Sequence, residues 1–319
     1  MKFIVIVISA TSLLLAGCKT CSRHMSASSP FEFALIGDTP YNAEQTTNQF
    51  PNLVAELNAA KLSFVVHDGD IKSGSSPCTD ELFQERLKQF ESIHHPLIYT
   101  FGDNEWTDCK GAAMNPGNAL KRLREIFTKG NQSLGQRKLT LTRQSGDPRF
   151  AAFRENVRWT KGKLTFATLH IVGSANNYGK PEFTARNAAN LAWLHDSFDH
   201  ARREHHRAIM LITQASPFVE RGSTNKVAPG YVDILRALTE ETLAFDGQVV
   251  FVHGDSHYVR IDKPMMGPTK RRVENFTRVE TFGDPDVHWW RVTADENDPN
   301  VFTFRQQIVK RNLVKHSAR

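Results

Sequence analysis

Four Gly-Asp pairs, each at the end of an apolar, strand-like run, constrain this chain more than any other feature. The pairs are Gly37-Asp38, Gly69-Asp70, Gly102-Asp103 and Gly254-Asp255. In an open α/β sheet the carboxyl ends of the strands meet at one edge, where ligands bind. Glycine allows the chain to turn sharply there, so that the carboxylate after it can point into a shared cleft. The pattern predicts an α/β protein whose converging carboxylates suit hard or borderline divalent metals.

Apolar periodicity predicts alternating strands and helices over the first two thirds of the chain, followed by strands alone. Residues 129–160 are irregular and polar, and Trp289 and Trp290 are expected to be divided between core and surface. We expect one domain over residues 31–309, with two stacked β-sheets flanked by helices and a strand pairing that stays open. The expected strands are 31–36, 62–66, 96–101, 164–172, 208–213, 248–252, 259–262, 273–282, 287–293 and 301–309, and the expected helices are 43–60, 80–93, 117–127, 184–203 and 231–243.

The N-terminus has the pattern of an export signal. An apolar segment over residues 4–16 is shorter than the roughly 20 residues that a membrane-spanning helix needs. It ends in Leu15-Ala16-Gly17-Cys18, which resembles a bacterial lipobox. We therefore predict a signal peptide over residues 1–17, lipidation of Cys18, and a polar tether over residues 18–30 that holds the exported protein at a membrane. An ordinary cleaved signal peptide and an uncleaved anchor are the alternatives.

Export would place the body of the chain in an oxidising compartment, where Cys78 and Cys109 can form a disulfide. Each cysteine follows one of the Gly-Asp pairs, so we expect their loops at the same edge of the sheet; two buried free thiols are the alternative. The formal net charge of +6 suits an anionic substrate or an anionic membrane surface. This charge is too weak and too dispersed to indicate nucleic-acid binding, and the basic tail, residues 310–319, is expected to be solvated.

The order of the motifs resembles that of the calcineurin-like metallophosphoesterases: Gly-Asp-x, then Gly-Asp-x-x, then Gly-x-Asn-Glu, then Gly-x-Ser-His. Residues 102–109, Gly-Asp-Asn-Glu-Trp-Thr-Asp-Cys, and residues 253–258, His-Gly-Asp-Ser-His-Tyr, resemble one exported bacterial branch of that superfamily. The resemblance covers residues 31–305 and implies an α/β/β/α sandwich. It also implies two divalent metal ions and a bridging hydroxide that attacks a phosphate ester.

Carried over position by position, the resemblance implies a ligand set of four residues. Asp38 would bind the first metal, Asp70 would bridge both metals, Asn104 would bind the second, and His257 would bind the first. A lone aspartate after a strand can equally be a helix cap or an Asx turn. The prediction therefore depends on the four positions acting together.

Several positions depart from the family pattern. Pro40 stands where a histidine ligand is usual, and its neighbour Tyr41 is either a substitute ligand or a packing residue. Gln214 replaces a histidine ligand and would bind through its amide oxygen, while Asp255 replaces the first histidine of Gly-His-x-His. Glu105 takes the place of the presumed general acid, with a structural carboxylate as the alternative. Because oxygen donors replace imidazoles, we expect manganese or magnesium rather than zinc, with the second ion held more weakly.

Other polar residues are candidates for contact with the substrate. Asn176 and Asn177 follow a predicted strand, and Arg149, Arg154 and Arg158 are candidate phosphate clamps. We predict a hydrolase that cleaves a small phosphorylated substrate, either as a monoesterase or as a diesterase. The alternative is a non-catalytic lipoprotein of the same fold that binds a ligand or a cell-envelope partner.

Overall fold

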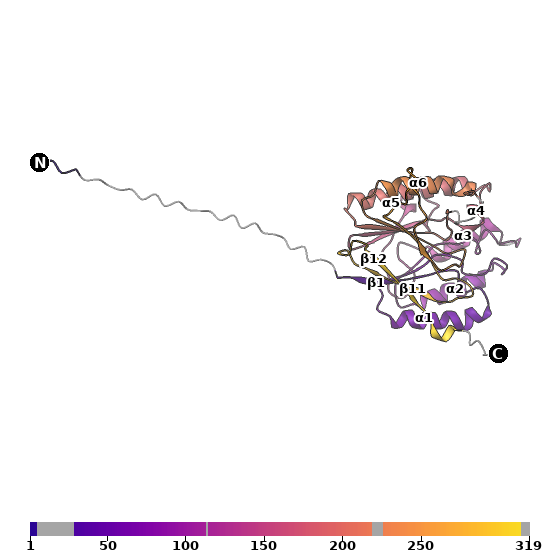
Figure 1. Ribbon diagram of the computed structural model, residues 1–319. Helices are drawn as coiled ribbons and strands as arrows, with labels where there is room; N and C mark the ends of the chain where they lie inside the picture. The colour runs from indigo at the N-terminus through magenta and orange to yellow at the C-terminus, as the bar shows by residue number, and fades with distance from the viewer. Residues whose placement is uncertain (5–28, 113, 219–225, 314–319) are drawn as a thin grey trace.

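The computed structural model describes residues 1–4, 29–112, 114–218 and 226–313 (Figure 1). Cys18, the predicted lipidation site, lies outside the described residues, as does most of the predicted signal peptide and tether. Within the described part of the chain, no helix is both long enough and apolar enough to cross a membrane.

The first of two sheets has five strands in the order β12-β11-β1-β2-β3. β1, β2 and β3 run parallel, whereas β11 is antiparallel to both β1 and β12. In the parallel part, Ala34 is opposite Val65, which is opposite Leu97. The strands are β1 (Phe31–Ile36), β2 (Val65–His67), β3 (Leu97–Tyr99), β11 (Trp289–Ala294) and β12 (Phe302–Gln307).

The second sheet has seven strands in the order β4-β5-β6-β7-β8-β10-β9. Its centre, from β6 to β10, is parallel, and its edges pair antiparallel. The strands are β4 (Thr142–Arg143), β5 (Val157–Lys161), β6 (Leu164–Thr168), β7 (Ala208–Ile212), β8 (Gln248–His253), β9 (Ile261–Asp262) and β10 (Phe276–Glu280).

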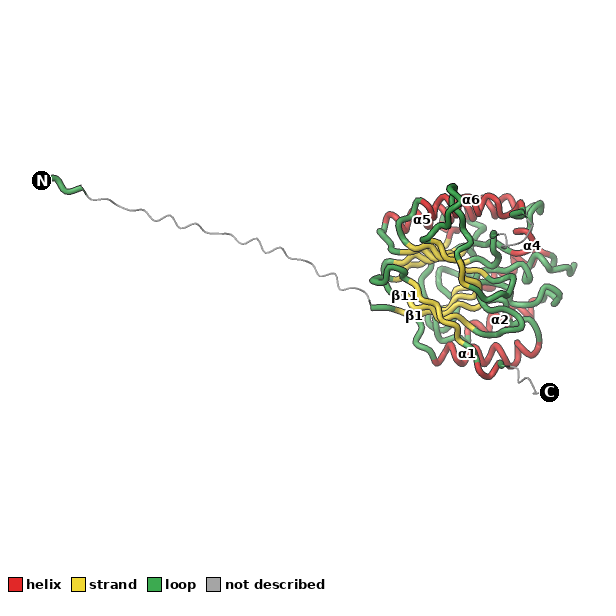
Figure 2. Tube along the Cα trace, in the orientation of Figure 1, coloured by secondary structure: helices red, strands yellow, loops and turns green. Residues whose placement is uncertain are grey.

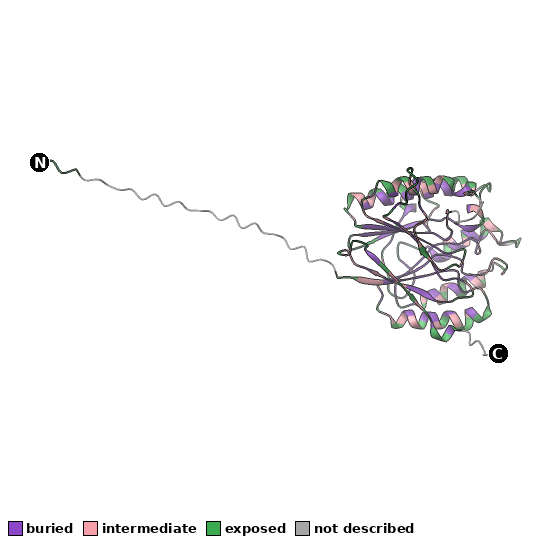
Figure 3. Ribbon diagram, viewed as in Figure 1, coloured by how far each residue is buried: buried purple, intermediate pink, exposed green. Residues whose placement is uncertain are grey.

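Helices cover the outer face of each sheet, and the two sheets face each other in the middle (Figure 2). One core lies between the first sheet and its helices, a second lies between the sheets, and a third lies under the helices of the second sheet. The helix faces turned toward the sheets are buried (Figure 3), which stabilises the sandwich by about 1.5–3 kcal/mol for each large apolar side chain. The helices are α1 (Phe50–Ala59), α2 (Asp80–Glu91) and α3 (Pro116–Phe127) on the first sheet, and α5 (Phe183–Arg203) and α6 (Val232–Leu243) on the second.

This architecture confirms the predicted α/β class and the two stacked sheets flanked by helices. Two details of the prediction are wrong. Trp289 and Trp290 are both buried, because one points into the core under α1–α3 and the other into the core between the sheets. Residues 129–160 are not wholly irregular, because β5 adds an antiparallel edge to the second sheet.

Parallel strands in both sheets explain where a site forms. Consecutive parallel strands all end on the same side of a sheet, so the loops that follow them lie together. In this protein the loops after β1, β2 and β3 come from the first sheet, and the loops after β6, β7 and β8 come from the second. Each of these six loops carries polar residues that the next section describes.

Candidate metal centre

The loops after β1, β2, β3 and β8 meet and carry the predicted carboxylates. Asp38 and Asp70 both have a left-handed backbone, with φ of 47° and 57°, a conformation that aspartate adopts more readily than most residues. A Cβ atom at Gly102 would collide with the carboxylate of Asp70, and one at Gly254 with that of Asp38. The glycine of one loop therefore leaves space for the carboxylate of another loop, so the Gly-Asp pairs depend on one another.

The hydroxyl of Tyr41 lies at the centre of a first group of potential ligands. Its oxygen is 3.3 Å from Asp38 Oδ1, 3.1 Å from Asp70 Oδ2 and 3.3 Å from His257 Nε2. Neighbouring donor atoms around an octahedral ion with bonds of about 2.1 Å lie about 3 Å apart. The three distances from the Tyr41 oxygen therefore match the spacing of neighbouring ligands of one ion, and Tyr41 is a candidate ligand beside Asp38, Asp70 and His257.

His257 is oriented by the loop that follows β10. Its Nδ1 lies 2.8 Å from the carbonyl oxygen of Asp284, so this nitrogen carries a hydrogen and Nε2 faces Asp38 Oδ1 at 3.5 Å. Burial lowers the pKa of His257, but the Asp38 carboxylate outweighs burial and raises that pKa to about 9. Without a metal, a proton on Nε2 balances the charge of Asp38, and a divalent ion would take the place of that proton.

A second group of potential ligands consists of carboxylates alone. One oxygen from each of Asp70, Asp103 and Asp255 lies within 4.8 Å of the other two. Ser174 donates a hydrogen bond to Asp103 Oδ2 at 3.0 Å. Asp103 Oδ1 is buried and has no hydrogen-bond partner within the described part of the chain. A buried acceptor without a donor is costly, and a cation among the three carboxylates would satisfy it.

Gln214 lies beside this second group, but its orientation differs from the predicted one. The backbone N–H of Gly173 donates to Gln214 Oε1 at 2.7 Å, which fixes that atom as the oxygen. The amide nitrogen therefore faces Asp70 Oδ2 at 3.2 Å and Asp255 Oδ1 at 3.1 Å. Because a metal cannot bind the NH₂ group, Gln214 holds the carboxylates and does not act as the predicted ligand in this arrangement.

Asn104 has a similar holding role. Its backbone N–H donates to Asp70 Oδ1 at 3.1 Å, and its side-chain Nδ2 donates to Asp70 Oδ2 at 2.8 Å and to the Tyr41 oxygen at 3.1 Å. The sequence prediction assigned Asn104 to the second metal and passed over Asp103. In the structure it is Asp103 that joins the carboxylate group, and Asn104 positions the shared Asp70.

Glu105 braces the loop after β3. Its Oε1 accepts hydrogen bonds from the Tyr99 hydroxyl at 2.7 Å and from the backbone N–H of Gly102 at 2.5 Å. The side chain is fully buried. The other oxygen, Oε2, is buried without a hydrogen-bond partner among the residues that the structure describes. Oε1 therefore holds the loop in place, while the role of Glu105 as a general acid stays a prediction.

The carboxylates of both groups titrate far from their ordinary values. Burial, followed by repulsion from neighbouring carboxylates, raises the pKa of Asp70 well above its usual range and that of Asp103 to about 7. Burial also raises the pKa of Asp38, and it raises that of Asp255 to about 6, although parts of Asp255 are exposed to solvent. Lys72, which is almost fully buried nearby, supplies one positive charge. With all four carboxyls ionised, the group would hold more negative charge than the nearby described side chains can balance, and the raised pKa values reflect this.

The segment after β6 forms one wall of the centre through an unusual backbone. Residues 174–177 all have positive φ, between 52° and 57°, so they make a left-handed turn without glycine. Asn176 is buried, donates to the carbonyl of Gly230 at 2.9 Å and accepts from Arg186 at 2.5 Å. Asn177 donates to Glu182 at 2.8 Å. The predicted substrate contacts Asn176 and Asn177 thus maintain the turn that carries Ser174 to the metal centre.

The three candidate phosphate clamps bond elsewhere. Arg149 pairs with Asp147, Arg154 donates to the carbonyl of Thr128, and Arg158 pairs with Asp196. None of these bonds involves a residue of the two carboxylate groups. The sequence offered no signal for choosing among the three arginines, and the structure brings none of them to the centre.

The predicted disulfide is confirmed: Cys78 and Cys109 are bonded, with Cα atoms 5.6 Å apart. It joins the loop after β2 to the loop after β3. These loops carry Asp70 and Asp103, so the covalent bond restrains two sides of the carboxylate group.

Comparisons with known proteins agree on the fold. No family model matches the chain, and a search of curated proteins found no significant match. A dimetal phosphatase from Danio rerio has a similar structure, with a TM-score of 0.57 at 11% identity over 88% of this chain and 96% of that one. A protein from Thermus thermophilus has a TM-score of 0.50 at 8% identity, over 88% of this chain and all of that one. The chain has the calcineurin-like metallophosphoesterase fold.

The residues present fit a divalent metal site. Asp103 Oδ1 lacks a donor in the described part of the chain, and the pKa values of Asp70 and Asp103 are raised by burial and then by like charges that a cation would neutralise. Carboxylate and phenol oxygens with a single imidazole form a hard ligand set. Such a site can bind and polarise an anionic ester.

Proposed function

We propose that this protein is a metal-dependent hydrolase of phosphate esters that acts on a small phosphorylated substrate. The observation that carries the proposal is the convergence of Asp70, Asp103 and Asp255, with Asp103 Oδ1 buried and unpartnered among the described residues, beside the pair formed by Asp38 and His257. In a purely structural site, each buried carboxylate would be paired with a basic side chain or fully hydrogen-bonded. The similarity in fold to a dimetal phosphatase supports the same interpretation.

Two positions for divalent ions follow from the geometry. Asp38, Tyr41 and His257 would hold a first ion and the pair Asp103 and Asp255 a second, with Asp70 shared between them. The second position has oxygen ligands only, which favours manganese or magnesium over zinc. Bound ions would supply charge to stabilise the phosphoryl group and would lower the pKa of a water nucleophile.

The protein's own residues would set the geometry for this reaction. Asn104 and Gln214 each donate to Asp70, which fixes the carboxylate that both ions would share. Ser174 fixes Asp103, and the carbonyl of Asp284 fixes the ring of His257. Such partners of metal ligands typically change metal affinity or activity by about 10–100-fold when removed.

The test measures metal content and hydrolysis together. Metal-free wild type is supplied with manganese or magnesium and assayed on a chromogenic phosphomonoester and a chromogenic diester, beside Asp70→Ala and the control Asp199→Ala, an exposed carboxylate on α5. We expect Asp70→Ala to lose metal and to lower kcat/KM by about a thousandfold or more, and the control to match wild type. Wild type that binds no metal and turns over no faster than Asp70→Ala would disprove the proposal.

We also propose that the protein is exported and anchored to a membrane through a lipid on Cys18. The support is the apolar segment over residues 4–16 followed by the lipobox-like motif. Cys18→Ser should release the protein from the membrane fraction of a bacterial host and remove the mass of the lipid from its N-terminal peptide. A wild-type protein without this added mass would contradict the anchor.

A further inference from the structure

A mostly apolar cavity of about 400 Å³ lies beside the metal centre. Its walls come from the loop after β3, from the start of α3 and from the loop before α5. Trp106, Leu120 and Pro181 supply apolar surface, and Thr107, Asn177 and Lys180 supply polar edges. This volume is within the range of sites for small organic molecules.

Two walls of this cavity are one turn away from the same metal-centre carboxylate. The backbone N–H of Trp106 donates to the carbonyl of Asp103 at 3.2 Å, and the Thr107 hydroxyl donates to the same carbonyl at 3.0 Å. On the opposite wall, the N–H of Asn177 donates to the carbonyl of Ser174, whose hydroxyl bonds Asp103. Three residues span at most about 10 Å, so the walls formed by Trp106 and Asn177 lie within about that distance of Asp103 and Ser174 along the chain.

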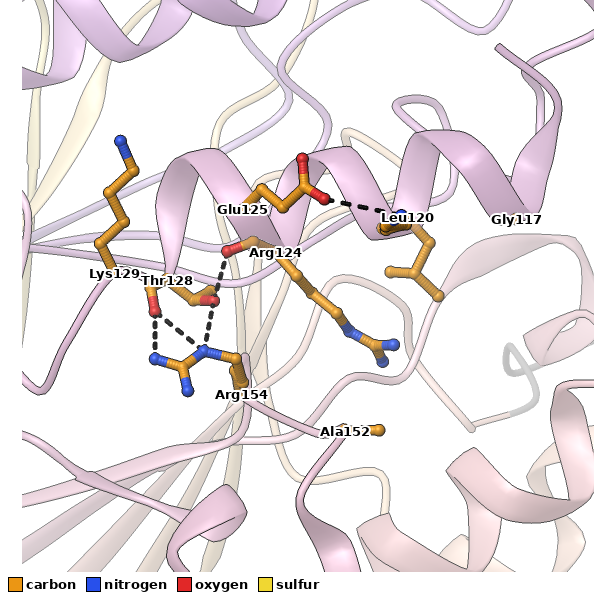
Figure 4. A pocket seen from close by; sticks show the side chains of 9 residues that line it. Gly117, Leu120, Arg124, Glu125, Thr128, Lys129, Ala152 and Arg154 are labelled. Carbon is orange, nitrogen blue, oxygen red and sulfur yellow. Dashed lines mark hydrogen bonds and ion pairs between the residues drawn. The ribbon is translucent and has the colours of Figure 1, made fainter. Parts of the chain in front are cut away.

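A second hollow, of about 630 Å³, shares Gly117 and Leu120 with this cavity (Figure 4). Its arginines are already engaged: Arg124 pairs with Glu155, and Arg154 donates to the carbonyl of Thr128. Among the described residues that line this hollow, none lies within three positions of Asp103 or Ser174, unlike Trp106 and Asn177 in the first cavity. Ala152, which lines only the second hollow, therefore gives a control position.

We propose that the cavity beside Trp106 binds the alcohol half of the phosphate ester and so selects substrates with a planar, apolar alcohol. This inference rests on the proposed hydrolase function. The metal centre would hold the phosphate, and the apolar walls would remove the ring from water. Burying one extra aromatic ring at about 25 cal/mol per Å² is enough for at least a tenfold preference.

The experiment compares naphthyl phosphate with phenyl phosphate, two esters that differ by one fused ring. We expect wild type to prefer the naphthyl ester by about tenfold in kcat/KM, mainly through KM. Pro181→Trp fills the cavity from an exposed loop position and should remove this preference. Ala152→Trp adds the same side chain to the second hollow and should leave the preference unchanged.

Direct binding separates this inference from the proposed function. Binding of 1-naphthol, the alcohol product, is measured by titration for wild type, Pro181→Trp, Lys180→Trp and Ala152→Trp, after circular dichroism confirms that each variant is folded. We expect affinity to fall about tenfold in the two cavity variants only. If wild type and all variants turn over the two esters with the same ratio of kcat/KM values, the cavity assignment is wrong, and the proposed hydrolase function is unaffected. Naphthol binding that follows the cavity variants, without any turnover, would support the cavity and disprove the hydrolase.

Discussion

Two buried carboxylates, Glu155 beside β5 and Asp70 in the candidate metal centre, show opposite electrostatics. Glu155, just before β5, is fully buried and accepts from Arg124 at 2.5 Å and 2.9 Å and from His170 at 2.9 Å. Burial raises its pKa, but Arg124 and His170 outweigh burial and hold the pKa of Glu155 well below its usual range. Asp70 in the metal centre is also buried, yet burial and neighbouring carboxylates raise its pKa well above the usual range.

The difference shows that burial alone does not mark a functional carboxylate. Glu155 has its counter-charges within the protein, so it links α3 to the second sheet as a structural element. The carboxylates of the metal centre have donors that fix their positions, as Gln214 and Asn104 do for Asp70, but few cations. A carboxylate that is positioned but not neutralised is prepared for a ligand that brings positive charge.

The largest expected effect is on stability at the balanced group. Glu155→Gln leaves Arg124 and His170 without their shared partner, so it should lower the free energy of unfolding by about 3–5 kcal/mol, as measured by urea denaturation. The matched control is Asp196→Asn, which breaks the pair with Arg158 at a side chain that is 52% exposed. We expect the control to cost at most about 1 kcal/mol. If Glu155→Gln and Asp196→Asn lower the free energy of unfolding equally, Glu155 is not a specially balanced buried carboxylate.

A smaller loss of stability is expected from the covalent bond beside the metal centre. Cys78 and Cys109 close a loop with a sequence separation of 31, and the double variant Cys78→Ser/Cys109→Ser should lose about 3–4 kcal/mol by the loop-entropy estimate. Reductant should destabilise wild type by a similar amount and should leave the variant unchanged. A wild type that is indifferent to reductant would show that the fold, and not the bond, restrains these loops.

Periodicity and turn residues predicted most of the fold. The expected strand 31–36 coincides with β1, and α2 begins at residue 80 as expected, because each has strong apolar spacing and a clear boundary. Thr79, for example, caps α2 by accepting from the N–H of Leu82. The order of strands in the sheets could not be predicted, because pairing depends on contacts between segments far apart in the chain. β5 escaped prediction for the same reason, since this strand in a polar segment is stabilised by its neighbours β4 and β6.

The sequence located the metal centre but not the direction of each side chain. Asp38, Asp70 and His257 lie together as predicted. Which of the neighbours Asp103 and Asn104 joins the carboxylates depends on the turn after β3, and no local pattern encodes that choice. The role of Gln214 was likewise hidden, because the donor that fixes its amide is Gly173, 41 positions earlier.

Asp103→Asn should have the opposite sign to Glu155→Gln in metal-free protein. The pKa of Asp103 is raised from 3.8 to about 7, so the stability linked to its neutral form is fully present below about pH 3.8 and is lost as pH rises through about 7. The variant has no charge to lose, and it should be more stable than wild type by roughly 1–3 kcal/mol at about pH 8.

Two controls make this difference specific. The stabilities of wild type and Asp103→Asn should converge as pH falls below the ordinary pKa of 3.8, where the carboxyl becomes protonated in both folded and unfolded chains. Saturating manganese should reverse the order near neutral pH, because ions that bind only the folded wild type stabilise it by mass action. A variant that is less stable than wild type in chelator at about pH 8 would show that Asp103 is balanced as Glu155 is.

The smallest effect expected is at Tyr41, where the two alternatives from the sequence give different results. Tyr41→Phe removes the hydroxyl that contacts Asp38, Asp70 and His257 but keeps the ring, whose centroid is 5.5 Å from that of His257. If the hydroxyl belongs to the first metal position, manganese affinity measured by calorimetry should fall about tenfold. Tyr178→Phe, at an exposed tyrosine, should leave affinity unchanged. An unchanged affinity in Tyr41→Phe would make Tyr41 a packing residue, and the first position would then rest on two carboxylates and one imidazole.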